Sequence, residues 1–118
     1  MVTYSALAVG LLTGRHRRGQ PPPPGSVWSA DRLAQALTPA GDAVVAEVMA
    51  ISQAHSVTPA QVALAWPLGR PPVSAPIIGP DLPEQVDEAF GALAVRLEPA
   101  ERERLDAASR WSESPEYL

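Results

Sequence analysis

The 118-residue chain contains no cysteine and no lysine. Without cysteine, these residues form no disulfide and support no thiolate chemistry, and the redox compartment is not indicated. Without lysine, the chain alone has no side-chain amine for a Schiff base or for tuning a neighbouring acid. All nine basic residues are therefore arginine.

An excess of positive charge and a long apolar run are also lacking. The net charge of −4 argues against a nucleic-acid partner, although three arginines cluster within residues 15–18. No apolar run is long enough to span a bilayer, and no signal peptide is recognisable. We therefore expect a cytoplasmic protein with neither a nucleic-acid nor a membrane partner. The hydrophobic content of 46% is compatible with a packed core.

Fourteen prolines and eight glycines divide the chain into short elements. Residues 15–30 are rich in proline and arginine, and we expect an exposed loop in which Arg17 and Arg18 are solvated. His16 lies in this loop and His55 at the end of a predicted helix, where a cation suits the helix dipole. Both histidines are expected to be exposed and not catalytic.

The hydrophobic pattern predicts two short strands, residues 1–4 and 75–79, each followed by helices. Thr58 and Pro59 together form a strong helix start signal. The helices are expected at residues 31–37, 40–54, 59–68, 83–93 and 99–108. This order predicts an α/β fold in which two βα units carry parallel strands. Residues 110–118 have no clear period and are expected to form an irregular tail.

The segment after the first strand carries the most information. Tyr4-Ser5-Ala6-Leu7 is followed by Gly10-Leu11-Leu12-Thr13-Gly14, which places an aromatic ring, a hydroxyl and small residues at a strand-to-loop junction. Backbone amides at such a junction can approach an anionic or planar ligand closely.

This segment closely resembles the loop after the seventh strand of aldo-keto reductases. Three further phrases resemble that family in the same order and spacing. Residues 57–66 resemble the helix that leads to the eighth strand. Residues 76–79, with Glu84 and Gln85, resemble that strand and the start of its helix. Residues 93–106 resemble the helix beside the closing edge of the barrel. The resemblance implies that residues 1–109 are the C-terminal two βα units of a (β/α)8 TIM barrel. The barrel is incomplete in this chain, because a whole one takes about 250 residues.

The resemblance also implies a nicotinamide cofactor, NADP or NAD. The Tyr4 ring would stack on the nicotinamide, and Arg15 would pair with phosphate oxygens through its guanidinium. The remaining cofactor-binding positions that match are Ser5, Leu7, Gly10, Thr13, Gly79, Gln85 and Glu88. The alternative is that Tyr4 simply packs in the barrel mouth and that the loop is an ordinary turn.

The second cofactor segment departs from the family pattern. Asp81 and Leu82 stand where the family usually has a basic residue and then a hydroxyl that bind the adenosine 2′-phosphate. Ala89 replaces the asparagine that commonly holds the adenine. An aspartate near a phosphate repels it, although Asp81 is equally well explained as a helix cap. We therefore expect at most a weak preference for NADP over NAD.

No catalytic residue is expected in the chain, because the family carries its catalytic Asp, Tyr, Lys and His on earlier strands. No metal-ligand spacing occurs either. The resemblance implies the cofactor-binding C-terminal part of an oxidoreductase that interconverts carbonyls and alcohols and is not catalytic on its own. The alternative is a non-catalytic remnant or an assembly module derived from the barrel edge.

We expect the chain to pair with a complementary N-terminal barrel polypeptide or to self-associate through its strand edges. A start in mid-strand fits a truncated gene, a wrong start site or a split gene equally well. The substrate stays open, because the substrate loops of the family lie largely outside these residues.

Overall fold

Two short strands and five α-helices make up the part of the chain that the computed structural model describes, residues 1–110. The irregular tail predicted for residues 110–118 lies almost entirely outside this part. The elements follow in the order β1 (Val2–Thr3), η1 (Leu11–Thr13), α1 (Ala30–Ala36), α2 (Pro39–His55), α3 (Pro59–Leu68), β2 (Ala75–Pro76), α4 (Pro83–Gly91), η2 (Ala92–Ala94) and α5 (Pro99–Ala108), where η marks a 3₁₀ turn.

The helix starts follow local sequence signals. Four of the five helices in residues 1–110 begin with proline, whose fixed φ suits the first helical position. The Thr58 hydroxyl accepts from the Gln61 amide, and the Gln61 side chain accepts from the Thr58 amide, which forms a capping box. The predicted bounds of α3 and α5 are confirmed. α4 ends at Gly91, and the chain continues as a 3₁₀ turn instead of the predicted helix to residue 93.

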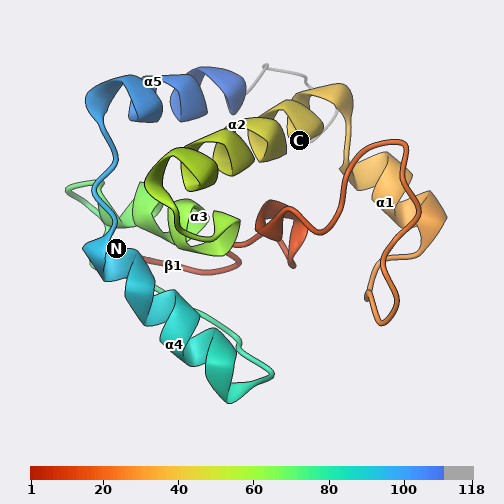
Figure 1. The fold of residues 1–118 in the computed structure, drawn as a ribbon, viewed down its shortest axis with the longest axis horizontal. Coiled ribbons are helices and arrows are strands. Elements are labelled where there is room, and N and C mark those ends of the chain that lie inside the picture. Colours follow the sequence, from red (N-terminus) through yellow and green to blue (C-terminus); the bar gives the residue numbers. More distant parts are fainter. Residues whose placement is uncertain (111–118) are drawn as a thin grey trace.

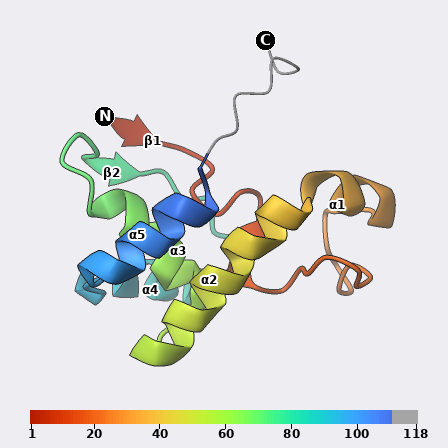
Figure 2. The ribbon, with the colours of Figure 1, turned by 90° about the horizontal axis from the view of Figure 1, so that it is seen from above.

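β1 and β2 pair in parallel, as the sequence predicts, with Val2 opposite Ala75 and Thr3 opposite Pro76. Figure 2 shows the two arrows side by side and pointing the same way. Each strand is two residues long, shorter than predicted, because Pro76 lacks an amide hydrogen and each strand has one neighbour within the described residues. The segments that follow β1 and β2 therefore leave the sheet at the same edge.

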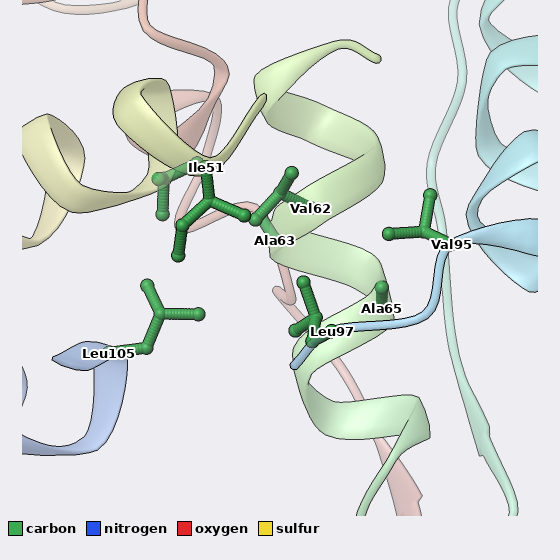
Figure 3. Packing of buried hydrophobic residues seen from close by; sticks show 8 residues of the cluster. Ile51, Val62, Ala63, Ala65, Val95, Leu97 and Leu105 are labelled. Atoms are coloured by element: carbon green, nitrogen blue, oxygen red, sulfur yellow. The ribbon is translucent and has the colours of Figure 1, made fainter. Parts of the chain in front are cut away.

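The core lies where α2, α3 and α5 meet, with α5 beside α2 and α3 beneath them in Figure 1. Side chains from all three helices point toward one another there, including Ile51, Val62 and Leu105, which are fully buried (Figure 3). The buried cluster consists of Val48, Ile51, Val62, Ala63, Ala65, Val95, Leu97 and Leu105. The spacing of Val44, Val48 and Ile51 predicts an apolar stripe on α2, and the apolar run of residues 62–66 predicts a buried α3. The structure confirms both predictions.

α4 differs from the other long helices because none of its residues is buried. The pattern predicts one apolar face with Val86, Phe90 and Leu93, yet Phe90 is 65% exposed and Leu93 56% exposed. The Gln61 side-chain amide donates to the Glu88 carbonyl at 3.0 Å and ties α4 to α3. Phe90 on α4 and Leu93 in the following 3₁₀ turn are therefore left exposed by residues 1–110, whereas Val86 is half-buried.

Candidate functional site

The segment from Tyr4 to Gly14 has an unusual backbone, and it is called the cofactor loop after the role that the resemblance implies. Ser5, Ala8 and Val9 have φ values of 54°, 50° and 55°, and Gly10 follows at 86°. The left-handed region costs an L-residue about 1–2 kcal/mol, and a β-branched residue such as Val9 is a genuine outlier there. Strained backbone of this kind is held in place by its surroundings and gathers at functional sites.

Hydrogen bonds and packing hold the cofactor loop. The Ala8 amide donates to the Ser5 carbonyl at 2.8 Å, and the Leu12 amide donates to the Leu7 carbonyl at 3.2 Å. Leu7 and Leu12 also pack against the buried cluster. At Gly14, whose φ is 80°, an added Cβ would lie 3.3 Å from Met49 and 3.4 Å from Pro59. The loop is thus seated on α2 and α3.

The predicted site residues of this loop serve different purposes in the structure. Tyr4 is 80% exposed, so its ring is free to meet a planar ligand. The Leu7 side chain anchors the loop to the core, which leaves its backbone for a ligand. The Thr13 hydroxyl donates to the Gly10 carbonyl at 2.7 Å and so closes the turn. Arg15 is exposed.

The second predicted segment lies after β2. Gly79 is exposed, with nothing within 4 Å of the position of an added Cβ. The Gln85 side-chain oxygen accepts from the amides of Asp81 at 2.7 Å and Leu82 at 3.2 Å. Glu88 contributes its carbonyl to the contact with α3.

The idea that Asp81 caps α4 is wrong. Leu82 occupies the N-cap position, so Asp81 lies one residue before it, and the Gln85 side chain reaches back to accept from the backbone amides of Asp81 and Leu82 themselves. The Asp81 carboxylate is therefore left exposed near the helix N-terminus.

The parallel register brings the two segments together. Thr3 lies opposite Pro76, so Tyr4 and Ile77 begin the two segments at the same edge of the sheet. On the helix side of β1, Ala6 and Leu12 line a mainly apolar cavity of about 340 Å³ together with Trp66 and Arg70. The register thus starts both predicted segments side by side, whereas Thr13 lies in η1, Arg15 lies beyond it, and Gln85 and Glu88 lie on α4.

The proline- and arginine-rich loop is less exposed than predicted. His16 is only 6% exposed, and its Nε2 lies 2.7 Å from the Ser26 hydroxyl. Arg17 donates to both carboxylate oxygens of Asp42, at 2.9 and 3.0 Å, and Arg18 donates to the Leu37 carbonyl at 3.2 Å. The expectation of an exposed His16 is therefore wrong, and Arg17 is partly buried in an ion pair, whereas Arg18 is exposed as predicted.

The physical reason for these corrections is the pairing with Asp42. The hydrogen bonds from Arg17 and from the Arg18 amide lower the pKa of Asp42 from 3.8 to about 2, despite its partial burial. Asp42 lies 25 residues from Arg17 along the chain, so no local pattern in the loop revealed the partner.

His55 links two helices. Its Nε2 lies 2.8 and 2.9 Å from the two carboxylate oxygens of Glu101 on α5. Burial raises the pKa of Glu101, but hydrogen bonds from the Glu98 amide and from His55 outweigh that effect, so the pKa lies below its ordinary value. His55 ends α2 as predicted, but it is half-buried and its contact is structural.

Sequence reasoning missed one contact to the cofactor loop. The Trp28 indole Nε1 donates to the Val9 carbonyl at 3.0 Å. A lone tryptophan in a polar, proline-rich loop was the available signal, since a large aromatic side chain there needs a surface to cover.

Metal sites and membrane-spanning helices are both absent from the part of the chain that the structure describes. Residues 1–110 contain no group of three or more acidic or histidine side chains arranged to hold a metal ion. Within the same residues, no helix combines the length and the apolar character needed to cross a membrane.

Comparison with known proteins agrees with the sequence phrases and the parallel strand pair. The profile of the Aldo/keto reductase family matches residues 1–110. The chain belongs to the aldo/keto reductase family.

Individual relatives support the same family. An aldo-keto reductase of Strobilurus tenacellus is 31% identical over 121 residues, which cover 98% of this chain and 34% of that protein. An NADP(+)-designated aldo-keto reductase of Schizosaccharomyces pombe is 32% identical over 85% of this chain and 30% of its own length. A putative voltage-gated potassium channel subunit beta of the same yeast is 37% identical over 76% of this chain and 27% of its own length. The chain thus spans about a third of the length of these relatives.

Proposed function

We propose that this chain is the cofactor-binding C-terminal part of an oxidoreductase of the aldo/keto reductase family. It would form the last two βα units of a (β/α)8 barrel and bind NADP or NAD at the edge where β1 and β2 end. The observation that carries the proposal is the cofactor loop itself. It has an exposed aromatic ring, a strained backbone held by the core and a second candidate segment at the same sheet edge.

The residues of this edge fit a nicotinamide dinucleotide in three respects. The Tyr4 ring is free for stacking. The amides of Ala6 and Leu7 donate no hydrogen bond within residues 1–110, so they are available to an anionic group. The exposed Arg15 supplies a guanidinium for phosphate oxygens.

The part of this chain in the reaction is to bind and orient the cofactor. When bound, a nicotinamide cofactor exchanges a hydride with the carbonyl or alcohol carbon of the substrate. The 118 residues contain no lysine, and both histidines are engaged in internal contacts. We therefore propose that the proton donor and its tuning residues come from a complementary barrel polypeptide.

We propose that the chain has at most a weak preference for NADP over NAD. The carboxylate of Asp81 lies where the resemblance puts the 2′-phosphate, and an approach of about 5 Å at an effective dielectric of 20 costs roughly 3 kcal/mol before solvent screening. One relative is designated NADP(+)-dependent, and Arg15 offers a compensating charge in this chain.

A second candidate function is an assembly module that binds no cofactor. The observation that favours it is the exposure of Phe90 on α4 and of Leu93 in the following 3₁₀ turn. One relative is designated a channel subunit. An assembly module would associate with itself or with a partner in light scattering and would not respond to either cofactor.

The test of the proposed function is a fluorescence titration of the chain with NADPH and NADH. Replacing Tyr4 by alanine removes the stacking ring and should raise the Kd by about tenfold, since base–aromatic stacking contributes about 1–3 kcal/mol. Tyr4→Phe keeps the ring and should leave the Kd within about twofold. Equal affinity of Tyr4→Ala and the parent chain, or turnover of aldehydes by the pure chain, would contradict the proposal.

A further inference from the structure

We propose that Trp28 is a positioning residue for cofactor binding, and that Trp28, Ser26 and His16 form a clasp that holds the cofactor loop in its binding conformation. This inference rests on the proposed function for the binding step. The clasp itself is defined by contacts that do not depend on a ligand.

The clasp acts at the most strained point of the cofactor loop. Ala8 and Val9 are consecutive non-glycine residues with positive φ. The turn around them is closed by backbone bonds from Ala8 to Ser5 and from Leu11 to Ala8. The indole of Trp28 binds the carbonyl of Val9 at 3.0 Å. This bond comes from 19 residues away and fixes a carbonyl that no backbone amide in residues 1–110 satisfies.

Trp28 is itself held by a small polar network. Its backbone amide donates to the Ser26 hydroxyl at 3.1 Å, and that hydroxyl also lies 2.7 Å from His16 Nε2. A hydroxyl has one donor and two acceptor positions, so Ser26 can satisfy both partners at once. The network therefore fixes the backbone of the residue that carries the indole.

His16 is the most buried residue of this network. The ring is 6% exposed, and its Nδ1 is buried without a hydrogen-bond partner among the described residues. Burying an unpaired ring nitrogen is unfavourable, so the ring is placed there at some expense to stability. The neighbouring Arg17 and Arg18 bind Asp42 on α2. The clasp is thus fastened to a core helix at one end and to Val9 at the other.

The clasp has a direct consequence for the ligand. The free amides of Ala6 and Leu7 and the ring of Tyr4 all precede Val9 in the same loop. If the loop relaxes from its left-handed turn, these groups lose the arrangement in which they converge on one ligand. Preorganisation of this kind lowers the entropic cost of binding.

The test compares two matched substitutions. Trp28→Phe keeps an aromatic ring but removes the donor to Val9. Trp66→Phe makes the same chemical change at a tryptophan whose Nε1 donates to Asp106 on α5 at 2.9 Å. Hydrogen exchange should speed up about fivefold at the amides of Ala8 and Leu11 in Trp28→Phe and stay unchanged at these two amides in Trp66→Phe. The amide of Leu12 is left out of this comparison because Leu12 lines the same cavity as Trp66.

The cofactor titration supplies the second readout. The Kd for the better-bound cofactor should rise about fivefold in Trp28→Phe, and Ser26→Ala should act in the same direction. Unchanged loop exchange in Trp28→Phe would overturn the clasp. Faster exchange with an unchanged Kd would overturn the positioning role.

The two proposals fail in different ways. If the parent chain binds neither cofactor, the proposed function and the positioning role fail together, and the exchange data alone decide whether the clasp exists. If Trp28→Phe does not fold, Ser26→Ala replaces it, because that change keeps the indole donor and removes only the hydroxyl that holds the Trp28 backbone amide.

Discussion

The two segments that follow the strands are built very differently. The segment after β1 is seated on α2 and α3, closed by its own hydrogen bonds and held by Trp28. The segment after β2 leads into α4, which buries no residue, and Gly79 has open space around it. One half of the candidate site is therefore organised by packing and hydrogen bonds, whereas the other half is only loosely packed within the described residues.

This contrast explains how a chain of this size can hold the backbone of the cofactor loop in its left-handed turn. The core of α2, α3 and α5 lies under the first segment, so the strained turn rests on packed side chains. α4 is connected to α3 through Gln61 but does not share its core. The first three predictions below test this division, beginning with the largest effect.

Shortening a core side chain should be far more damaging than shortening one on α4. Leu105 is fully buried and Phe90 is 65% exposed. Leu105→Ala should lower the free energy of unfolding by about 2–5 kcal/mol, and Phe90→Ala by less than about 0.5 kcal/mol. Urea denaturation followed by circular dichroism measures both. Similar losses in the two variants would mean that α4 is covered in solution, as in a self-associated chain.

A substitution in the segment after β2 should alter the preference between NADP and NAD without affecting the fold. Asp81→Arg replaces the exposed carboxylate with a cation for the 2′-phosphate. The ratio of the two dissociation constants should shift toward NADP by about tenfold, which corresponds to about 1.4 kcal/mol. Parallel titrations with NADPH and NADH measure this ratio. An unchanged ratio would place the 2′-phosphate elsewhere, with Arg15 as the next residue to replace.

The ion pair between Arg17, just after the cofactor loop, and Asp42 on α2 should make a smaller, pH-dependent contribution to the free energy of unfolding. Because the pKa of Asp42 is lowered from 3.8 to about 2, the pair with Arg17 stabilises the fold above pH of about 4. This stability is lost as the pH falls toward about 2. Both side chains are partly exposed, so we expect about 1 kcal/mol. Asp42→Asn should remove this part of the pH dependence.

Urea midpoints of the parent chain and of Asp42→Asn at pH 6, 4 and 2 measure the effect. The two curves should differ most at pH 6 and converge at pH 2. A constant difference across that range would show that the Arg17–Asp42 pair does not contribute through its charge.

Local signals in the sequence predicted much of this fold. Thr58 followed by Pro59 placed the start of α3, since capping and the first helical position depend only on adjacent residues. The spacing of Val48 and Ile51 identified the buried face of α2. The parallel pairing followed from the order of the elements. These features are short-range or topological, which is why they could be predicted.

Long-range and competing contacts could not be predicted. His16 is buried because Ser26 and the arginine contacts to α2 fold the loop back, and Trp28 reaches Val9 across 19 residues. The face of α4 is amphipathic, but its pattern cannot say whether a partner is present. Asp81 is not the cap because α4 begins one residue later than an Asp81 cap requires, with Leu82 at the N-cap position. The roles assigned to Tyr4 and Arg15 stay predictions.

The most direct test of the account is a chemical-shift map of the ¹⁵N-labelled chain during titration with NADPH and with NADH. We predict that the largest amide shifts fall within residues 4–15, with smaller shifts in residues 79–88, where the segment is less organised. Shifts spread over α2 and α5, or an absence of shifts at saturating concentrations of both cofactors, would contradict the assignment of this edge as the cofactor site.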